Sequence, residues 1–280
     1  MVAEGYPSLP MLPRPKAARD GFPSRIVCLT EETVETLWLL GAWDLVVGVS
    51  GFAVRPKEAR QKPRVSSFLS ARYEKILALE PDLVLAFSDL QAEIWRDLVK
   101  MGVPVFTFNQ RSVDEILSMI QQLGGIVGYH EEAAALVTRL QLGIDATRER
   151  AASLPRRPRV YFEEWDRPMI SGIRWVTEIV GIAGGEDILP ELRECRLAKD
   201  RIPAEATVIA RDPELILASW CGKKVRPERI AGRPGWEGVT AVRQGRIFEI
   251  KSPIILQPGP AALTDGLAEL ERRVGDAARG

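Results

Sequence analysis

Residues 131–153, EEAAALVTRLQLGIDATRERAAS, carry apolar side chains at spacings of three and four and contain no strand-like run. Such spacing places the apolar side chains on one face of a helix. A helix of this length extends about 33 Å at 1.5 Å per residue. The proline-containing segment LPRRPR (154–159) follows and ends it. The stretch therefore predicts one long helix that divides the chain into two parts.

The part before this helix alternates strand and helix patterns from Arg25 onward. Short apolar, β-branched runs predict strands, and segments with helical periodicity separate them. The strand runs are RIVCL (25–29), DLVVGVS (44–50), DLVLAF (82–87) and PVFTF (104–108). This alternation predicts a mostly parallel sheet that is covered by helices on both faces.

The part after the helix follows the same plan. Its predicted strands are RVYFEEW (159–165), ELILASW (214–220) and RIFEI (246–250), and its predicted helices are IRWVTEIVGIAGG (173–185) and GPAALTDGLAELERRV (259–274). The predicted fold class is α/β, with two Rossmann-like lobes joined by one long α-helix. The predicted divisions are an extension at 1–24, a lobe at 25–128, the linking helix at 129–154 and a second lobe at 155–280.

Composition excludes several classes of function. Lys+Arg and Asp+Glu both number 38 in 280 residues, and a chain without net charge is not typical of nucleic-acid binding. No apolar run reaches the roughly 20 residues that span a bilayer, so membrane insertion is not expected. Three widely separated cysteines predict no disulfide framework. The single histidine, His130, excludes HExxH and multi-histidine metal sites.

The first 24 residues bear on localisation. They contain five prolines and scattered charges. They lack the run of 7–15 apolar residues that a signal peptide needs. The chain as written is therefore expected to be cytoplasmic, with a flexible proline-rich extension at its start.

Several segments, taken in order, resemble the periplasmic binding proteins of siderophore, haem and cobalamin ABC importers, and most of all the cobalamin-binding branch. These segments are RIVCLTEETVETLWLLGAWDLVVGVS (25–50), YEKILALEPDLVLAF (73–87), ISGIRWVTEIVGIAGGEDIL (170–189), RDPELIL (211–217) and AVRQGRIFEI (241–250) followed by PGPAALTDGLAEL (258–270). The resemblance covers the chain from about Arg25 to its C-terminus. It implies the helical-backbone substrate-binding fold, a ligand cleft between the lobes and a monomer. It is specific for the superfamily and not for a ligand.

Three phenylalanines of the first lobe follow or end predicted strands. In open α/β sheets, ligands lie beyond the carboxyl ends of the strands. Phe87 ends one strand, Phe52 follows another, and Phe68 lies in the loop SSFLS (66–70). The resemblance assigns all three to a ligand wall, because cobalamin binders carry aromatic rings there. The alternative is that some of these rings belong to the core.

In the second lobe, the candidates around the first strand are Glu163, Trp165 and Met169. Neighbouring strand residues point to opposite faces, so Glu163 is expected on the side of Trp165, and Glu164 on the other. A pair of catalytic carboxylates is therefore not implied. Glu163 either meets a polar ligand group or is a solvated strand end. The resemblance assigns Trp165 and Met169, in the loop after the strand, to an apolar ligand wall.

The segment SWCGKKVR (219–226) follows another predicted strand and brings Trp220, Cys221 and Lys223 to the same edge. Nearby lysines favour the thiolate of Cys221, which would then coordinate a metal centre in the ligand. The alternatives are an inert thiol in a turn and lysines that neutralise ligand carboxylates or phosphates. Gln257, in IKSPIILQPGP (250–260), is a candidate polar contact.

The resemblance also implies a transporter partner. Members of the family dock on their permease through one acidic residue on each lobe, and the matching positions are Glu74 and Glu205. The alternative is that both are ordinary carboxylates in the first turns of helices, where they favour the helix dipole.

The function expected from these features is that of a substrate-binding protein. It would hold a cobalamin-like corrinoid, haem or metal-siderophore, as in ABC-type import, with no required cofactor and no catalysis. The alternative is a cytosolic chelatase-like or cofactor-processing enzyme, or a sensor or carrier, on the same fold. The sequence has no GxGxxG, P-loop or GxSxG motif to support an enzyme.

Overall fold

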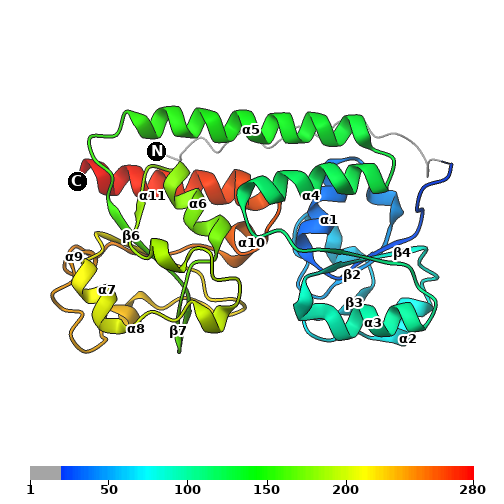
Figure 1. Cartoon of the computed structure of the whole chain (residues 1–280), viewed down its shortest axis with the longest axis horizontal. Coiled ribbons are helices and arrows are strands. Elements are labelled where there is room, and N and C mark those ends of the chain that lie inside the picture. Colours follow the sequence, from blue (N-terminus) through cyan, green and yellow to red (C-terminus); the bar gives the residue numbers. More distant parts are fainter. Residues whose placement is uncertain (1–19) are drawn as a thin grey trace. The chain divides into compact units, whose positions relative to one another are not determined.

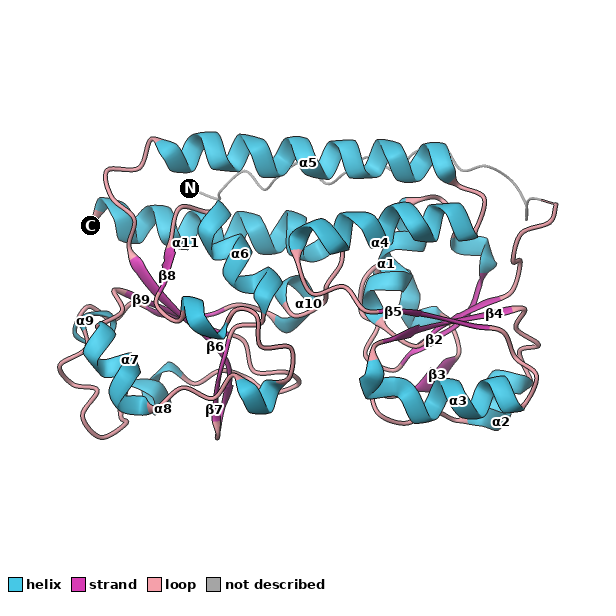
Figure 2. Ribbon diagram, viewed as in Figure 1, coloured by secondary structure: helices cyan, strands magenta, loops and turns pink. Residues whose placement is uncertain are grey.

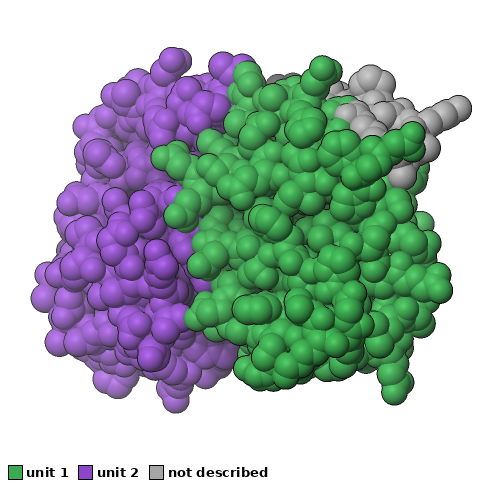
Figure 3. Space-filling view, turned by 45° about the vertical axis from the view of Figure 1, so that its right-hand side comes forward, with its two compact units in different colours: residues 1–110, 114–139 green, residues 111–113, 140–280 purple. Residues whose placement is uncertain are grey.

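The computed structural model describes residues 20–280, which form two compact units (Figure 3). Unit 1 comprises the described residues up to Gln110 together with Asp114–Arg139, and unit 2 comprises Arg111–Val113 together with Leu140–Gly280. The N-terminal extension predicted over residues 1–24 lies outside the described residues as far as residue 19.

Unit 1 is built on one sheet with the strand order β3-β2-β1-β4-β5, and each neighbouring pair is parallel. Its strands are β1 (Ile26–Cys28), β2 (Val46–Ser50), β3 (Arg64–Ser66), β4 (Leu83–Phe87) and β5 (Val105–Phe108). Its helices are α1 (Glu31–Leu39), α2 (Tyr73–Leu77), α3 (Ala92–Lys100) and α4 (Val113–Ile126), with short 3₁₀ turns at η1 (Trp43–Leu45), η2 (Lys57–Gln61) and η3 (Asp89–Gln91). Figure 1 shows α2 and α3 on one face of this sheet and α1 and α4 on the other.

Unit 2 is built on a second sheet with the strand order β10-β9-β6-β7, in which β8 also pairs with β6. Its strands are β6 (Arg159–Asp166), β7 (Met169–Ser171), β8 (Glu186–Asp187), β9 (Leu215–Ala218) and β10 (Ile247–Glu249). Its helices are α6 (Arg174–Ile182), α7 (Glu205–Arg211), α8 (Pro227–Ala231), α9 (Thr240–Arg243), α10 (Ser252–Ile255) and α11 (Leu267–Arg279), with 3₁₀ turns at η4 (Pro190–Leu192) and η5 (Ala198–Asp200) and a π-helical turn at η6 (Ala262–Gly266). Only β7 runs antiparallel to its neighbour among these strands (Figure 2).

The long helix expected from residues 131–153 is α5 (His130–Ala152), a single helix of 23 residues. It begins in unit 1 and ends in unit 2, because the division falls between Arg139 and Leu140. In unit 1 its first turns pack closely against α4. A Cβ atom on Gly124 would lie 2.2 Å from the Cβ of Ala133, so this contact requires glycine. The fold class predicted from the sequence, two α/β lobes and one long helix, is confirmed.

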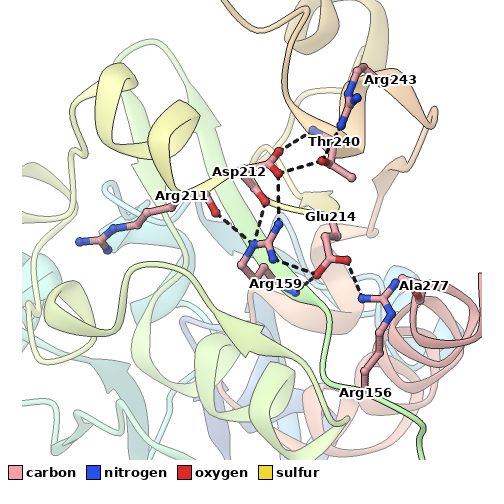
Figure 4. A network of polar contacts seen from close by, with 8 residues as sticks. All are labelled: Arg156, Arg159, Arg211, Asp212, Glu214, Thr240, Arg243 and Ala277. Carbon is pink, nitrogen blue, oxygen red and sulfur yellow. Dashed lines mark hydrogen bonds and ion pairs between the residues drawn. The ribbon is translucent and has the colours of Figure 1, made fainter.

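The amino ends of β6 and β9 are fixed by a network of charged residues (Figure 4). Arg159, the first residue of β6, donates hydrogen bonds to the carbonyl oxygens of Arg211 and Asp212, and its guanidinium lies 3.1 Å from the Asp212 carboxylate. Glu214 accepts from the Arg159 amide at 3.0 Å and from Arg156 at 2.5 Å. These contacts align β6 with the start of β9.

Some short elements differ from the expectations. Met169 was expected in a loop, but it is the first residue of β7, which pairs with the end of β6. Strand β3 was not predicted from the sequence. Each of these strands has three residues, which is too few for an alternating pattern to appear in the sequence.

Candidate functional site

The carboxyl edge of the unit 1 sheet contains a topological switch point. Strands β1, β2 and β3 extend the sheet in one direction, whereas β4 and β5 extend it in the other. The chain therefore leaves β1 and β4, which are neighbours, toward opposite sides of the sheet. The crevice formed at such a point is the usual ligand site of open parallel sheets.

Phe52 and Phe68 lie in the loops that follow two neighbouring strands, β2 and β3, at this edge. Ser50 of β2 pairs with Ser66 of β3, and each phenylalanine follows two residues later. The amide of Gly51 donates to the carbonyl oxygen of Ser66 at 2.7 Å, which joins the two loops. Phe52 is 54% exposed and Phe68 is half-buried. The edge thus presents two accessible rings on backbone that is hydrogen-bonded together.

Gln91, which is fully buried, holds three loops of this edge in place. Its side-chain oxygen accepts from the amide of Phe87 at 2.9 Å. Its side-chain nitrogen donates to the carbonyl oxygen of Phe68 at 2.9 Å and to that of Leu29 at 3.4 Å. Phe87 itself is buried, so it supports the edge from inside. Gln91 was not among the residues singled out from the sequence.

Two buried ionisable groups, Cys28 and Glu32, lie at the end of β1 and at the start of α1. Burial raises the pKa of Glu32 to about 8, against the hydrogen bond that it accepts from the Thr30 hydroxyl at 2.6 Å. Burial also raises the pKa of the Cys28 thiol to about 12, and the nearby Glu32 adds to the effect. Thr30 occupies the N-cap position of α1, but its hydroxyl bonds to Glu32 and does not cap the helix backbone.

In unit 2, Glu163 is the centre of a buried polar cluster. Its carboxylate is fully buried and receives two hydrogen bonds from Arg233, at 2.6 and 2.9 Å. The indole nitrogen of Trp220 donates to the same carboxylate at 3.1 Å. Arg233 also lies 3.3 Å from the sulfur of Met169. The structure thus brings together Glu163, Met169 and Trp220, with Arg233 as the residue that joins them.

These contacts correct two expectations for this cluster. Glu163 is neither a solvated strand end nor an accessible group, because Arg233 and Trp220 occupy its oxygens. Trp220 is fully buried and does not line the surface at the mouth of unit 2. Both residues can support a ligand surface from beneath but do not form its outer layer.

Trp165, Asp166 and Lys223 form a second cluster, which contacts Trp220 of the first. The ammonium of Lys223 lies 2.8 and 2.9 Å from the two carboxylate oxygens of Asp166. It also lies 5.0 Å from the ring centroids of both Trp165 and Trp220. Burial alone would raise the pKa of Asp166, but the hydrogen bonds from Lys223 and the charges of Lys223 and Arg229 hold this pKa below its ordinary value. Trp165 is half-buried and packs on the core of unit 2.

Glu164 lies on the other face of β6, as the alternation of strand side chains predicts. It pairs with the buried guanidinium of Arg201, at 2.8 and 3.1 Å, and accepts from the amide of Ile173. Glu163 and Glu164 therefore belong to separate clusters, and they form no carboxylate pair.

The remaining predicted contacts are at the surface. Cys221 is exposed in the turn that follows Trp220. Gln257 is half-buried, just after α10. Glu74 and Glu205 are exposed in the first turns of α2 and α7. Within residues 20–280, no three His, Cys, Asp or Glu side chains are grouped so that they could hold a metal ion.

Sequence reasoning missed the residues that hold the carboxyl edge of the unit 1 sheet and the two clusters of unit 2. These residues are Gln91, Asp166, Arg229 and Arg233. Each is a polar residue in a segment that reads as a loop or as the end of an element. Asp166 had a usable signal, because it directly follows Trp165 at the end of a strand. The other three are identified only by the contacts that the fold creates.

The chain matches the family described as periplasmic binding protein over residues 26–254. It is 28% identical over 201 residues to a vitamin B12-binding protein of Yersinia pestis (strain Pestoides F), which covers 70% of this chain and 69% of the relative. The vitamin B12-binding protein of Yersinia pseudotuberculosis serotype O:1b (strain IP 31758) has the same identity and coverage.

Solved structures share the fold at lower identity. The periplasmic vitamin B12 binding protein BtuF of Vibrio cholerae superposes with a TM-score of 0.74 and 21% identity, covering 92% of this chain and 99% of that one. The periplasmic heme-binding protein RhuT of Roseiflexus sp. RS-1 gives a TM-score of 0.79 and 23% identity, covering 91% and 99%. The sequence match extends over most of the chain, and the fold agrees with it: this chain is a member of the periplasmic binding protein family.

Proposed function

We propose that this substrate-binding protein holds a flat, metal-containing macrocycle at the carboxyl edges of its sheets. The observation that supports this most directly is the pair of accessible rings, Phe52 and Phe68, on adjoining loops of unit 1. Aromatic rings stack on flat, polarisable ligands and gain from the burial of their own apolar surface. The half-buried indole of Trp165 is a similar surface on unit 2.

Among such macrocycles we favour a corrinoid. The sequence relatives that share 28% identity over 201 residues are vitamin B12-binding proteins. Haem is the second candidate, because RhuT and BhuT, which share the fold, are heme-binding proteins. Either molecule would be the cargo and not a resident cofactor. We assign direct contacts to Phe52, Phe68, Trp165, Lys223 and Gln257, and supporting roles to Phe87, Glu163, Met169 and Trp220. The exposed thiol of Cys221 is a further candidate for contact with the metal.

The family also supports delivery of the cargo to an ABC permease. Glu74 and Glu205 are exposed in the first turns of helices on different units, and we propose them as the docking residues. The enzymatic alternative is not favoured, because the family is one of binding proteins. A cytoplasmic location finds no support either, since the family is described as periplasmic. None of the helices in the described part of the chain has both the length and the apolar character needed to cross a membrane.

Titration with cyanocobalamin, haemin and a ferric siderophore, followed by absorption and by thermal unfolding, tests the proposal. We expect one of the macrocycles to shift its own spectrum and to raise the melting temperature by mass action. Phe52→Ala should weaken that affinity roughly tenfold, since a lost aromatic contact corresponds to about 1.4 kcal/mol. Phe106→Ala removes another exposed ring, on β5, and should leave the affinity unchanged. If neither macrocycle binds, the proposal is wrong.

A further inference from the structure

Trp220 is fully buried although the four residues that follow it, Cys221 to Lys224, are all exposed. We call these four residues the cover turn. The amide of Lys223 donates to the carbonyl oxygen of Trp220 at 3.0 Å, which closes the turn. Gly222 has φ +69° and open space around it, so the turn uses a conformation that glycine adopts readily. A fully buried indole is thus followed directly by a short exposed turn.

The side chain of Lys223 supplies part of that cover. Its ammonium lies 5.0 Å from the ring centroids of both Trp165 and Trp220, and the Arg229 guanidinium lies 6.0 Å from that of Trp220. A cation at this distance is attracted by the ring faces. The protein's own cations therefore occupy ring surface on which a ligand would stack.

Asp166 holds these cations. It is 5% exposed and contacts Lys223 at 2.8 Å and Arg229 at 3.4 Å. The Lys223 side chain is 38% exposed, so water competes for this ion pair and its strength is modest. The nearby pair of Glu163 and Arg233 is much more deeply buried, with side-chain exposures of 0% and 11%. The Lys223–Asp166 pair is therefore suited to exchanging its partners with a ligand, whereas the Glu163–Arg233 pair is suited to a permanent place in the core.

We propose that the Lys223–Asp166 ion pair is an exchangeable latch over Trp220, and that the ligand that opens it carries a carboxylate or phosphodiester on a flat ring. Such an anion competes with Asp166 for Lys223 and Arg229. When Lys223 follows the anion, the ring faces of Trp165 and Trp220 become available for stacking. The identity of the ligand class rests on the proposed function, whereas the latch itself does not.

The latch is tested without ligand by acrylamide quenching of tryptophan fluorescence. Lys223→Ala should increase the quenching, and the increase should disappear when Trp165→Phe and Trp220→Phe are added. Asp166→Asn keeps the shape of the side chain but loses its charge, and it should increase the quenching as well. Lys224→Ala removes the neighbouring lysine of the same turn and should match the wild type. Folding of each variant is checked by circular dichroism. If folded Lys223→Ala and Asp166→Asn are both quenched like the wild type, there is no latch.

The anionic group is tested by titration with haemin and with haemin dimethyl ester, in which both carboxylates are esterified. The wild type and Lys224→Ala should bind haemin roughly tenfold more tightly than the ester, whereas Lys223→Ala should bind the two about equally. Equal binding of the two by the wild type overturns the inferred anion and leaves the proposed function intact. If neither compound nor cyanocobalamin binds, the proposed function fails, and the quenching comparison still decides whether the latch exists.

Discussion

Glu32 shows how one buried carboxyl makes the stability of this fold depend on pH. Its pKa is raised by burial from 4.5 to about 8. Between these values the folded protein binds a proton that the unfolded chain has released. The free energy of unfolding therefore falls as pH rises through this window.

Glu32→Gln removes this titration while keeping the shape of the side chain. Relative to the wild type, we expect the variant to gain stability between pH 5 and pH 9, by an amount on the order of a few kcal/mol. Urea unfolding of both proteins across this range measures the difference. If the free energies of unfolding of the two proteins change in parallel with pH, Glu32 is ionised in the folded protein. Glu131→Gln, at an exposed position of α5, provides a control for the loss of a carboxylate.

At the same scale, the exposure of several candidate residues differs from what their places in the sequence predict. Phe52 was identified after a predicted strand and Phe68 in a predicted loop, both through the family resemblance, and both are accessible. Glu163 and Trp220 also follow or end strands, yet both are fully buried. Arg233, which pairs with Glu163, is distant from it in sequence and is brought to it only by the fold, and Lys223 lies over the ring of Trp220.

Among the elements, β6 and the end of α7 depend on Asp212, which ends that helix in the left-handed conformation at φ 43°. Its carboxylate accepts from the amide and the hydroxyl of Thr240, at 2.7 and 2.8 Å, and from Arg159. Burial alone would raise the pKa of Asp212, but the Thr240 hydrogen bonds and the neighbouring arginines lower it. The stabilisation is therefore present at neutral pH and is lost as pH falls through this lowered pKa.

Asp212→Ala should lower the free energy of unfolding by about 1 kcal/mol, a value that allows for solvent screening of a partly exposed group. The loss combines the Thr240 and Arg159 contacts with the strain of alanine at positive φ. Asp212→Asn keeps an acceptor oxygen and tolerates this backbone conformation, so it should lose less. Thermal unfolding of the three proteins makes the comparison. An alanine variant as stable as the wild type would mean that Arg159 and Glu214 suffice to hold β6.

Most helices and strands were predictable because their runs of regularly spaced apolar residues are long enough to be recognised in the sequence. Helix α5 and strands β4 and β6 correspond closely to the runs in the sequence. Strands β3 and β7 did not stand out, since three residues carry no period and their positions are set by pairing with β2 and β6.

For the whole molecule, docking on a permease can be separated from ligand binding. Glu74→Lys and Glu205→Lys reverse two exposed charges that lie on different units. We expect each variant to bind the ligand as the wild type does, but to reduce ligand-stimulated ATP hydrolysis by the cognate ABC permease in proteoliposomes. The physical reason is that a lysine repels the positively charged groups with which an acidic docking residue would pair. Glu131→Lys reverses an exposed charge on α5 and serves as the control. Full ATPase stimulation by both variants would contradict the assignment of the docking residues.

The course of the chain has a consequence for any attempt to prepare the units separately. The chain passes from one unit to the other after Gln110, after Val113 and after Arg139. A fragment that starts at Leu140 would lack Val113, whose amide donates to Glu178 at 2.7 Å. It would also keep only about half of α5, and isolated helices shorter than roughly 12–15 residues are marginal in water. Each unit is therefore expected to be incomplete when expressed alone, and the protein should be prepared as one continuous chain.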